Sequence, residues 1–153
     1  MRLSVGIGLG PLLAMCLAGC RNEPMSFGSL TLRLDVHPRQ VSPDDSFTVH
    51  LVIRNVGTAD TTLTSGCSVP TFFGLDSPAG IVYPAPGMGC LTVITRFRIP
   101  AGDSLTQTRR FVAHDIAKAG YPPLPPGEYF VFTDWQIGGL PVLRQTLTVT
   151  ATR

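Results

Sequence analysis

The sequence predicts an all-β chain folded as an antiparallel β-sandwich of about seven or eight short strands. Apolar and polar residues alternate with a period of two along most of the chain after residue 29, the pattern of strands with one buried face. Turn sequences rich in Pro, Gly and Asp separate these segments at short intervals. Because the strands do not alternate with helical segments, a sandwich is favoured over a parallel α/β fold.

Six strands are predicted from this alternation. In most of them apolar residues alternate with Thr, Arg, His or Asp; the fourth is the weakest, and the fifth is apolar on both faces. In chain order they span Leu30–Val36, Phe47–Ile53, Leu91–Ile99, Leu105–Phe111, Tyr129–Trp135 and Leu143–Val149. We expect the fifth at the centre of a sheet, packed on each side.

Turn chemistry connects these strands. Ser42–Asp45 carries proline at its second position and suits a type I turn. Ile99–Asp103 and Leu124–Glu128 are Pro-Gly segments that each lead into a strand. Asp115–Ala119 is the one segment that suggests a helical turn.

One segment indicates the type of sandwich. Leu124–Val131 resembles the tyrosine corner of immunoglobulin-like and fibronectin-like domains, in which a tyrosine hydroxyl bonds back to the backbone across a turn. Tyr129 would be that tyrosine, with Val131 pointing into the same core. The predicted fold is therefore an immunoglobulin-like β-sandwich.

The first twenty residues have the three parts of an export signal. Arg2 is followed by an uncharged stretch, Leu3–Leu17, and then by Ala18-Gly19-Cys20. The stretch is too short and too rich in glycine for a membrane-spanning helix. Leu17–Cys20 resembles a bacterial lipobox, in which the cysteine is lipidated and becomes the first mature residue. An ordinary cleaved signal, with Cys20 incidental, is the alternative.

Three regions follow from this interpretation. Residues 1–19 are a cleaved lipoprotein signal peptide, 20–28 the lipidated cysteine and a short tether, and 29–153 the sandwich. A flexible tether of that length reaches about 15 Å, which keeps the domain close to the bilayer. Arg21 follows the lipidated cysteine where an aspartate would resemble an inner-membrane retention signal. We expect an exported protein of the cell envelope, at the outer membrane or outer surface, the periplasmic side included.

The remaining cysteines suggest a disulfide. Cys16 leaves with the leader and Cys20 carries lipid, so Cys67 and Cys90 remain. An even pair in an exported domain is typical of a disulfide, which would stabilise the fold by about 3 kcal/mol. Metal ligation is the competing interpretation, but neither cysteine has a CxxC partner or a nearby histidine.

Composition argues against nucleic acid. The formal net charge is +2, and removing Arg2 with the leader leaves about +1. No basic stripe with interleaved aromatic residues is present.

No catalytic motif is present either. The sequence lacks a G-x-S-x-G elbow, an H-E-x-x-H motif and a P-loop. His37 and His50 fall on polar strand faces. His114 and Asp115 would point to opposite faces of a strand. We therefore expect no enzyme and no cofactor.

Calcium is a minor alternative. Four aspartates could in principle meet at one end of the sandwich: Asp44, Asp45, Asp76 and Asp103. Turns already explain their positions, and no Asp-x-Asp-x-Asp loop occurs, so no metal site is predicted.

The order of several motifs resembles the BsuPI-type intracellular proteinase inhibitor domain, an immunoglobulin-like bacterial module. The motifs are Asn55-Val56-Gly57, Thr61–Cys67, Phe72–Asp76, Gly80–Tyr83, Pro100-Ala101-Gly102 and Leu124–Val131. The resemblance covers most of residues 29–151 and implies a proteinase inhibitor. Tyr83-Pro84 stands where the family often has a tryptophan.

The segment between the two cysteines is the predicted partner-binding region. A proline-stiffened loop closed by a disulfide loses less entropy on docking. Its candidate contact residues are Tyr83, Pro84, Pro86 and Met88. Phe72, Phe73 and Ile81 are expected to belong to the core instead.

The expected function is a non-enzymatic protein-binding module, anchored to the membrane through lipid on Cys20 and binding an envelope protein. One alternative is a proteinase inhibitor that presents the Cys67–Cys90 loop to a protease. A second alternative is an accessory envelope scaffold without a tight partner.

Overall fold

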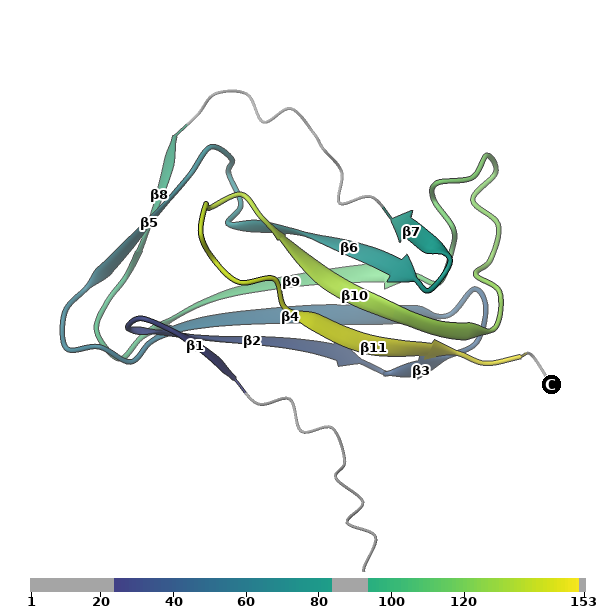
Figure 1. The fold of residues 1–153 in the computed structure, drawn as a ribbon, viewed down its shortest axis with the longest axis horizontal. Helices are drawn as coiled ribbons and strands as arrows, with labels where there is room; N and C mark the ends of the chain where they lie inside the picture. The colour runs from purple at the N-terminus through teal and green to yellow at the C-terminus, as the bar shows by residue number, and fades with distance from the viewer. Residues whose placement is uncertain (1–23, 84–93, 152–153) are drawn as a thin grey trace, which may run out of the picture.

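The computed structural model describes residues 24–83 and 94–151, which form eleven strands and no helix. The fold class is a β-sandwich, as predicted (Figure 1). In chain order the strands are β1 Met25–Phe27, β2 Leu30–His37, β3 Gln40–Val41, β4 Ser46–Asn55, β5 Thr61–Ser65, β6 Thr71–Ser77, β7 Gly80–Tyr83, β8 Thr95–Ile99, β9 Ser104–Val112, β10 Gly127–Trp135 and β11 Arg144–Val149.

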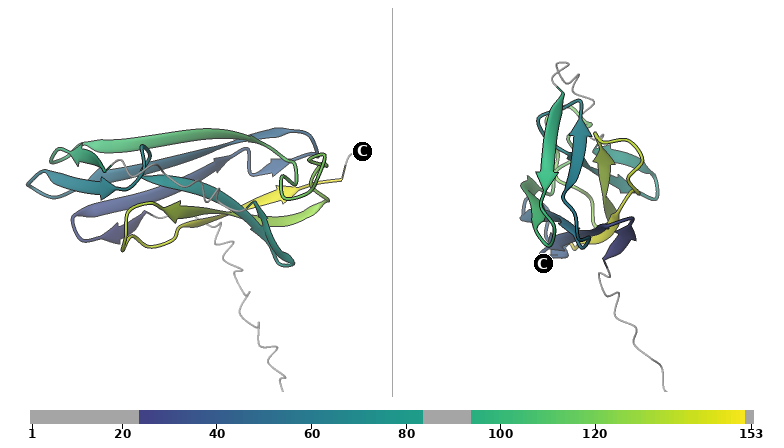
Figure 2. Two further views of the ribbon diagram at one scale, coloured as in Figure 1. Left: turned by 90° about the horizontal axis from the view of Figure 1, so that it is seen from above. Right: turned by 90° about the vertical axis from the view of Figure 1, so that its left-hand side faces the viewer.

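The strands form two main sheets and a ribbon. The first sheet has the order β1-β2-β4-β9 and is antiparallel throughout. The second has the order β3-β11-β10-β6-β7 and is antiparallel except for β3, which runs parallel to β11. β5 and β8 pair as a separate ribbon that projects from one end of the sandwich (Figures 1 and 2).

The structure has more strands than the seven or eight predicted. β1 and β3 are too short to display alternation, with three and two residues respectively. β6 carries apolar residues on both faces around Gly74, which hides its period. The third predicted strand is described only from β8 onward, because Leu91–Val93 lie outside the described residues.

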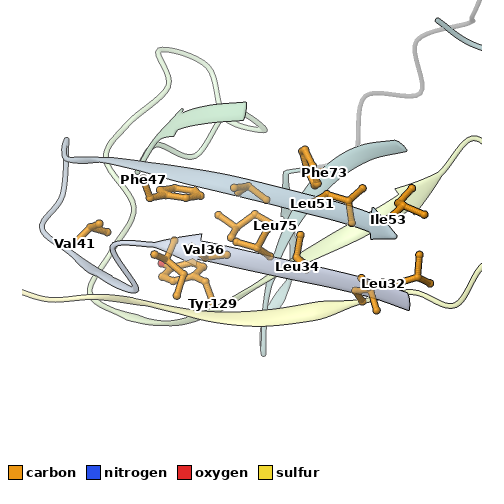
Figure 3. Packing of buried hydrophobic residues seen from close by; sticks show 14 of the residues in the cluster. Leu32, Leu34, Val36, Val41, Phe47, Leu51, Ile53, Phe73, Leu75 and Tyr129 are labelled. Atoms are coloured by element: carbon orange, nitrogen blue, oxygen red, sulfur yellow. The ribbon is translucent and has the colours of Figure 1, made fainter. Parts of the chain in front are cut away.

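The core lies where the alternation places it. The apolar residues of β2 and β4 are buried, and those of β10 and β11 meet them from the second sheet. Figure 3 shows side chains from both sheets pointing into one space, among them Leu34, Leu51, Leu75 and Tyr129. Burial of these side chains is the main driving force for pairing the two sheets.

β10 occupies the predicted central position in its sheet, with a buried inner face and a half-buried outer face. It lies between β11 and β6. Tyr129, Val131 and Thr133 face the core, whereas Phe130 and Phe132 lie half-buried on the outer face. Neighbouring strands cover Phe132: its ring lies over Gly74, and the Arg144 guanidinium is 5.7 Å from the ring centroid. Among the described residues, the outer face of β10 is therefore covered in part, by side chains of the neighbouring strands.

The sheet begins earlier than the boundary predicted at residue 29. β1 falls within the predicted tether and pairs with β2 in the register Met25↔Leu32 and Phe27↔Leu30. No helix in the described part of the chain is long and apolar enough to cross a membrane. The signal peptide and Cys20 lie outside the described residues, so both stay predictions.

Candidate interaction surface

The connection between β9 and β10, residues 113–126, is the most elaborately braced loop of the described chain; we call it the β9–β10 loop. It lies at the end of the sandwich away from the β5–β8 ribbon (Figure 1). Backbone hydrogen bonds join the beginning and the end of the loop. The Leu124 N–H donates to the Ala113 carbonyl, and the Asp115 N–H to the Pro122 carbonyl, both at 2.8 Å. Closed ends and internal packing are the features of a compact Ω-type loop.

Asp115 braces the interior of the loop. This buried carboxylate accepts the Ala117 N–H at 3.1 Å and pairs with the Lys118 ammonium at 3.0 Å. The backbone continues in turns, with the Tyr121 N–H donating to the Lys118 carbonyl at 3.2 Å. The segment predicted as a helical turn, Asp115–Ala119, forms a turn closed by the Lys118 N–H, which donates to the Asp115 carbonyl at 3.3 Å, and does not extend into a helix.

Tyr129 anchors the second arm of the loop. Its hydroxyl donates to the Pro125 carbonyl at 2.7 Å, the hydrogen bond that a tyrosine corner makes. The ring is buried in the core, and this burial raises the pKa of the Tyr129 phenol, with a further contribution from the Asp115 charge. The neutral hydroxyl that donates this bond is therefore retained into alkaline solution.

We expect Tyr129→Phe to lower the free energy of unfolding by about 1 kcal/mol, because the Pro125 carbonyl loses its donor while the ring stays packed. Chemical denaturation of the soluble domain measures this. Tyr121→Phe is the matched control: this exposed tyrosine has no hydroxyl bond within the described residues and should change stability by less than about 0.5 kcal/mol. Equal stability of wild type and Tyr129→Phe would argue against the corner.

The turn between β3 and β4 lies beside the β9–β10 loop and forms hydrogen bonds with it. The His114 Nε2 lies 2.6 Å from an Asp44 carboxylate oxygen, and the Ala113 N–H donates to the Asp45 carbonyl at 2.8 Å. Asp44 has a φ of 70°, which belongs to the third position of a type II turn rather than the predicted type I. Aspartate tolerates this conformation, and here its carboxylate also pairs with His114.

No catalytic or metal-binding arrangement is found in the described residues. His114 faces Asp44 and Asp115 faces Lys118, so the pair does not combine into a dyad. The four aspartates considered for calcium do not converge; Asp76, for example, pairs with Arg144 on the second sheet. Among residues 24–83 and 94–151, no three His, Cys, Asp or Glu side chains are grouped to hold a metal.

The braced loop presents apolar side chains to solvent. Tyr121 is 60% exposed and Ile116 40% exposed, and Val112, where β9 enters the loop, is exposed as well. Tyr121 also has a φ of 48°, a left-handed conformation that non-glycine residues seldom adopt and that the surrounding bonds of the loop must hold in place. A loop already fixed in shape loses little entropy on binding, so this geometry favours a partner contact.

The predicted site residues lie elsewhere. Tyr83 ends β7, where its backbone pairs with Leu75, and Pro84, Pro86, Met88 and Cys90 lie outside the described residues. Cys67 is buried, with its sulfur 3.3 Å from the Gln136 side-chain oxygen. The Cys67–Cys90 pairing therefore stays a prediction. Phe73 is in the core as expected, whereas Phe72 is only half-buried on the outer face.

Sequence reasoning missed the β9–β10 loop as a site. The sequence predicts a binding region in the proline-rich segment between the cysteines because that segment combines aromatic residues with prolines. Gly120-Tyr121-Pro122-Pro123 carries the same signal in fewer residues. The contacts that fix this loop, above all those of Asp115 and Asp44, depend on tertiary structure.

Comparison with known proteins identifies no family. No family model and no curated protein matches the chain. Among solved structures, a β-glucosidase from Erythrobacter marinus aligns with a TM-score of 0.50 and 11% identity over 80% of this chain and 15% of that one. A β-glucosidase from Listeria innocua gives 0.49 and 15%, over 79% and 16%. The CARDB domain of a Pyrococcus furiosus protein gives 0.46 and 12%, over 84% and 100%.

The similarity to the Erythrobacter marinus β-glucosidase shows the fold alone. The chain spans less than a fifth of the length of the two glucosidases, and the identities are low. None of these three proteins is a BsuPI-type inhibitor, and the BsuPI-type resemblance stays an interpretation of the sequence.

Proposed function

We propose that this protein is an exported lipoprotein, anchored through Cys20, whose sandwich is a non-enzymatic module that binds a protein of the cell envelope. The observation that carries the binding proposal is the β9–β10 loop, a braced loop with exposed Tyr121 and Ile116 at its surface. The anchoring proposal is supported by the leader and by Leu17–Cys20.

The chemistry of the loop suggests the character of the partner surface. A tyrosine and an aliphatic side chain on a rigid backbone suit an apolar pocket on a folded protein, because large amphipathic side chains supply most of the energy at such contacts. The contact is small, so the partner interaction is transient or gains from tethering both proteins to one membrane.

A Cys67–Cys90 disulfide is part of the proposal. Its support is that Cys67 is buried and that Cys67 and Cys90 are the two cysteines that follow the leader and the lipidated Cys20. The bridge would constrain the segment that carries Tyr83, Pro84, Pro86 and Met88. In the inhibitor alternative that segment, and not the β9–β10 loop, would contact the protease.

The test is photo-cross-linking of the lipidated protein in cells of the producing bacterium. With a photoreactive phenylalanine analogue in place of Tyr121, we expect one discrete adduct with an envelope protein. Ile116→Ser in the same chain should lower its yield about tenfold, because an apolar contact is worth roughly 1–2 kcal/mol at an interface. The analogue at Thr106, exposed on β9, is the matched control and should give no such adduct.

Three outcomes separate the candidate functions. An adduct specific to position 121 supports the binding module. A protease captured only from position 83, at the end of β7, would favour the inhibitor alternative. Identical weak products from positions 121 and 106 would contradict the loop as a binding surface and favour a scaffold without a tight partner.

A further inference from the structure

Two exposed apolar side chains lie on the strand with which the chain enters the sandwich. Met25 and Phe27 of β1 are 43% and 44% exposed. We call these two residues the β1 patch.

The register explains why Met25 and Phe27 are on one face. They pair with Leu32 and Leu30, whose side chains are buried, so all four lie on the inner face of the first sheet. β1 is the edge strand of that sheet, and its inner face is not covered as that of β2 is. Ser26, between them, lies on the opposite face.

The length of the chain before β1 determines what this patch meets. Cys20 and Met25 are separated by five residue steps, so their Cα atoms lie at most about 17 Å apart even when the chain is fully extended. Lipid on Cys20 therefore holds β1 next to the headgroup layer. Met25 and Phe27 are the first exposed apolar side chains of the sandwich that follow the anchor.

We propose that the β1 patch is a membrane-contact surface, with Met25 and Phe27 inserted at the boundary between headgroups and acyl chains of a phospholipid bilayer. The proposal rests on the proposed anchoring at Cys20. Apolar side chains of this kind bury favourably at that boundary, where lipidation alone leaves the orientation of a domain free. The β9–β10 loop lies at the other end of the sandwich, so a bilayer at β1 leaves it accessible (Figures 1 and 2).

Tryptophan fluorescence of the full lipidated protein in phosphatidylcholine vesicles tests this. Phe27→Trp and Met25→Trp place a reporter on the proposed contact face, and Ser26→Trp is the matched control on the opposite face. The single native Trp135, on β10, supplies the baseline. With bromine on the upper acyl chains, we expect the added emission at 25 and 27 to fall by about half and that at 26 to change little. Melting curves check that each variant is folded.

The outcomes distinguish this proposal from the anchoring on which it rests. Cys20→Ala should release the protein from vesicles, and a wild type that does not sediment with vesicles would show that the anchor itself is absent. A protein that sediments but shows no quenching at 25 and 27, or equal quenching at all three positions, overturns the contact surface alone. A concentration-dependent blue shift at 27 without vesicles would assign the patch to a second copy of the chain and overturn it too.

Discussion

Asn55→Asp should lower the free energy of unfolding by about 3 kcal/mol at pH 7, the largest single effect we predict. Asn55 ends β4 and is completely buried. Its side-chain amide donates to the Ala59 carbonyl at 2.8 Å and to the Ile99 carbonyl at 3.0 Å, and its oxygen accepts the Gly57 N–H at 3.0 Å. One side chain thereby joins the β4–β5 connection to the end of β8.

An aspartate has nearly the same shape but the wrong chemistry for this position. An ionised carboxylate would keep the bond from Gly57 but would face two carbonyl oxygens with no proton to share. A protonated carboxyl restores one of the two donated bonds. Burial and the two carbonyls therefore raise the pKa of the introduced carboxyl in the folded state above its ordinary value of about 4.

The sign of the pH dependence follows from that shift. Below the unfolded pKa both states are protonated and the variant loses only one hydrogen bond. As pH rises above about 4 the unfolded state ionises first, and stability falls by up to about 1.4 kcal/mol per pH unit until the folded pKa is reached. Urea denaturation of the variant and of the wild type at pH 4 and at pH 7 measures this loss of stability. Ser104→Asp adds the same charge at an exposed site and should cost less than about 0.5 kcal/mol.

A loss that is equal at both pH values would show that charge is not the cause. The loss would then come from the missing amide donor alone, and Asn55→Ser, which leaves none of the three bonds in place, would be more destabilising than Asn55→Asp at both pH values.

Periodicity predicted the strands whose burial is one-sided. β2 and β4 keep strict alternation because one face meets the core and the other meets water, so the sequence pattern and the structure coincide. β6 was not predicted because its outer face is also apolar, so apolar and polar residues do not alternate along it. Gly74 on that face is covered by the Phe132 ring of β10, a contact that no local pattern encodes.

The sequence predicts less of the candidate interaction surface than of the fold. Tyr129 was identified because a tyrosine corner is a local motif, with its acceptor only four residues away. The rest of the loop depends on Asp44, seventy residues from its partner His114. The β1 patch was hidden for a different reason: three residues are too few for a period, so β1 was assigned to the tether.

Gly74→Ala should lower the free energy of unfolding by about 2 kcal/mol, through overpacking. Gly74 pairs with Phe132 across β6 and β10 on the outer face of the second sheet. A Cβ at Gly74 would lie 2.5 Å from Phe132 Cε1 and 2.6 Å from Cε2, and closer still to Cζ, so the ring must move. Arg144 stacks on this ring and pairs with Asp76 at 3.0 Å, so moving it also disturbs an ion pair that spans three strands.

A double-mutant cycle with Phe132→Ala separates this clash from any general intolerance of β6. Once the ring is removed, Gly74→Ala should become neutral or stabilising by about 0.5 kcal/mol, because alanine loses less backbone entropy than glycine in a strand. The coupling between the two positions should then reach about 2 kcal/mol, as expected for residues in contact and not for distant, independent sites. Gly138→Ala is the matched control, since a Cβ there meets nothing within 4 Å. If Gly74→Ala costs as much without the ring as with it, the clash with Phe132 is not the cause of the loss, and β6 is intolerant of a side chain at this position for another reason.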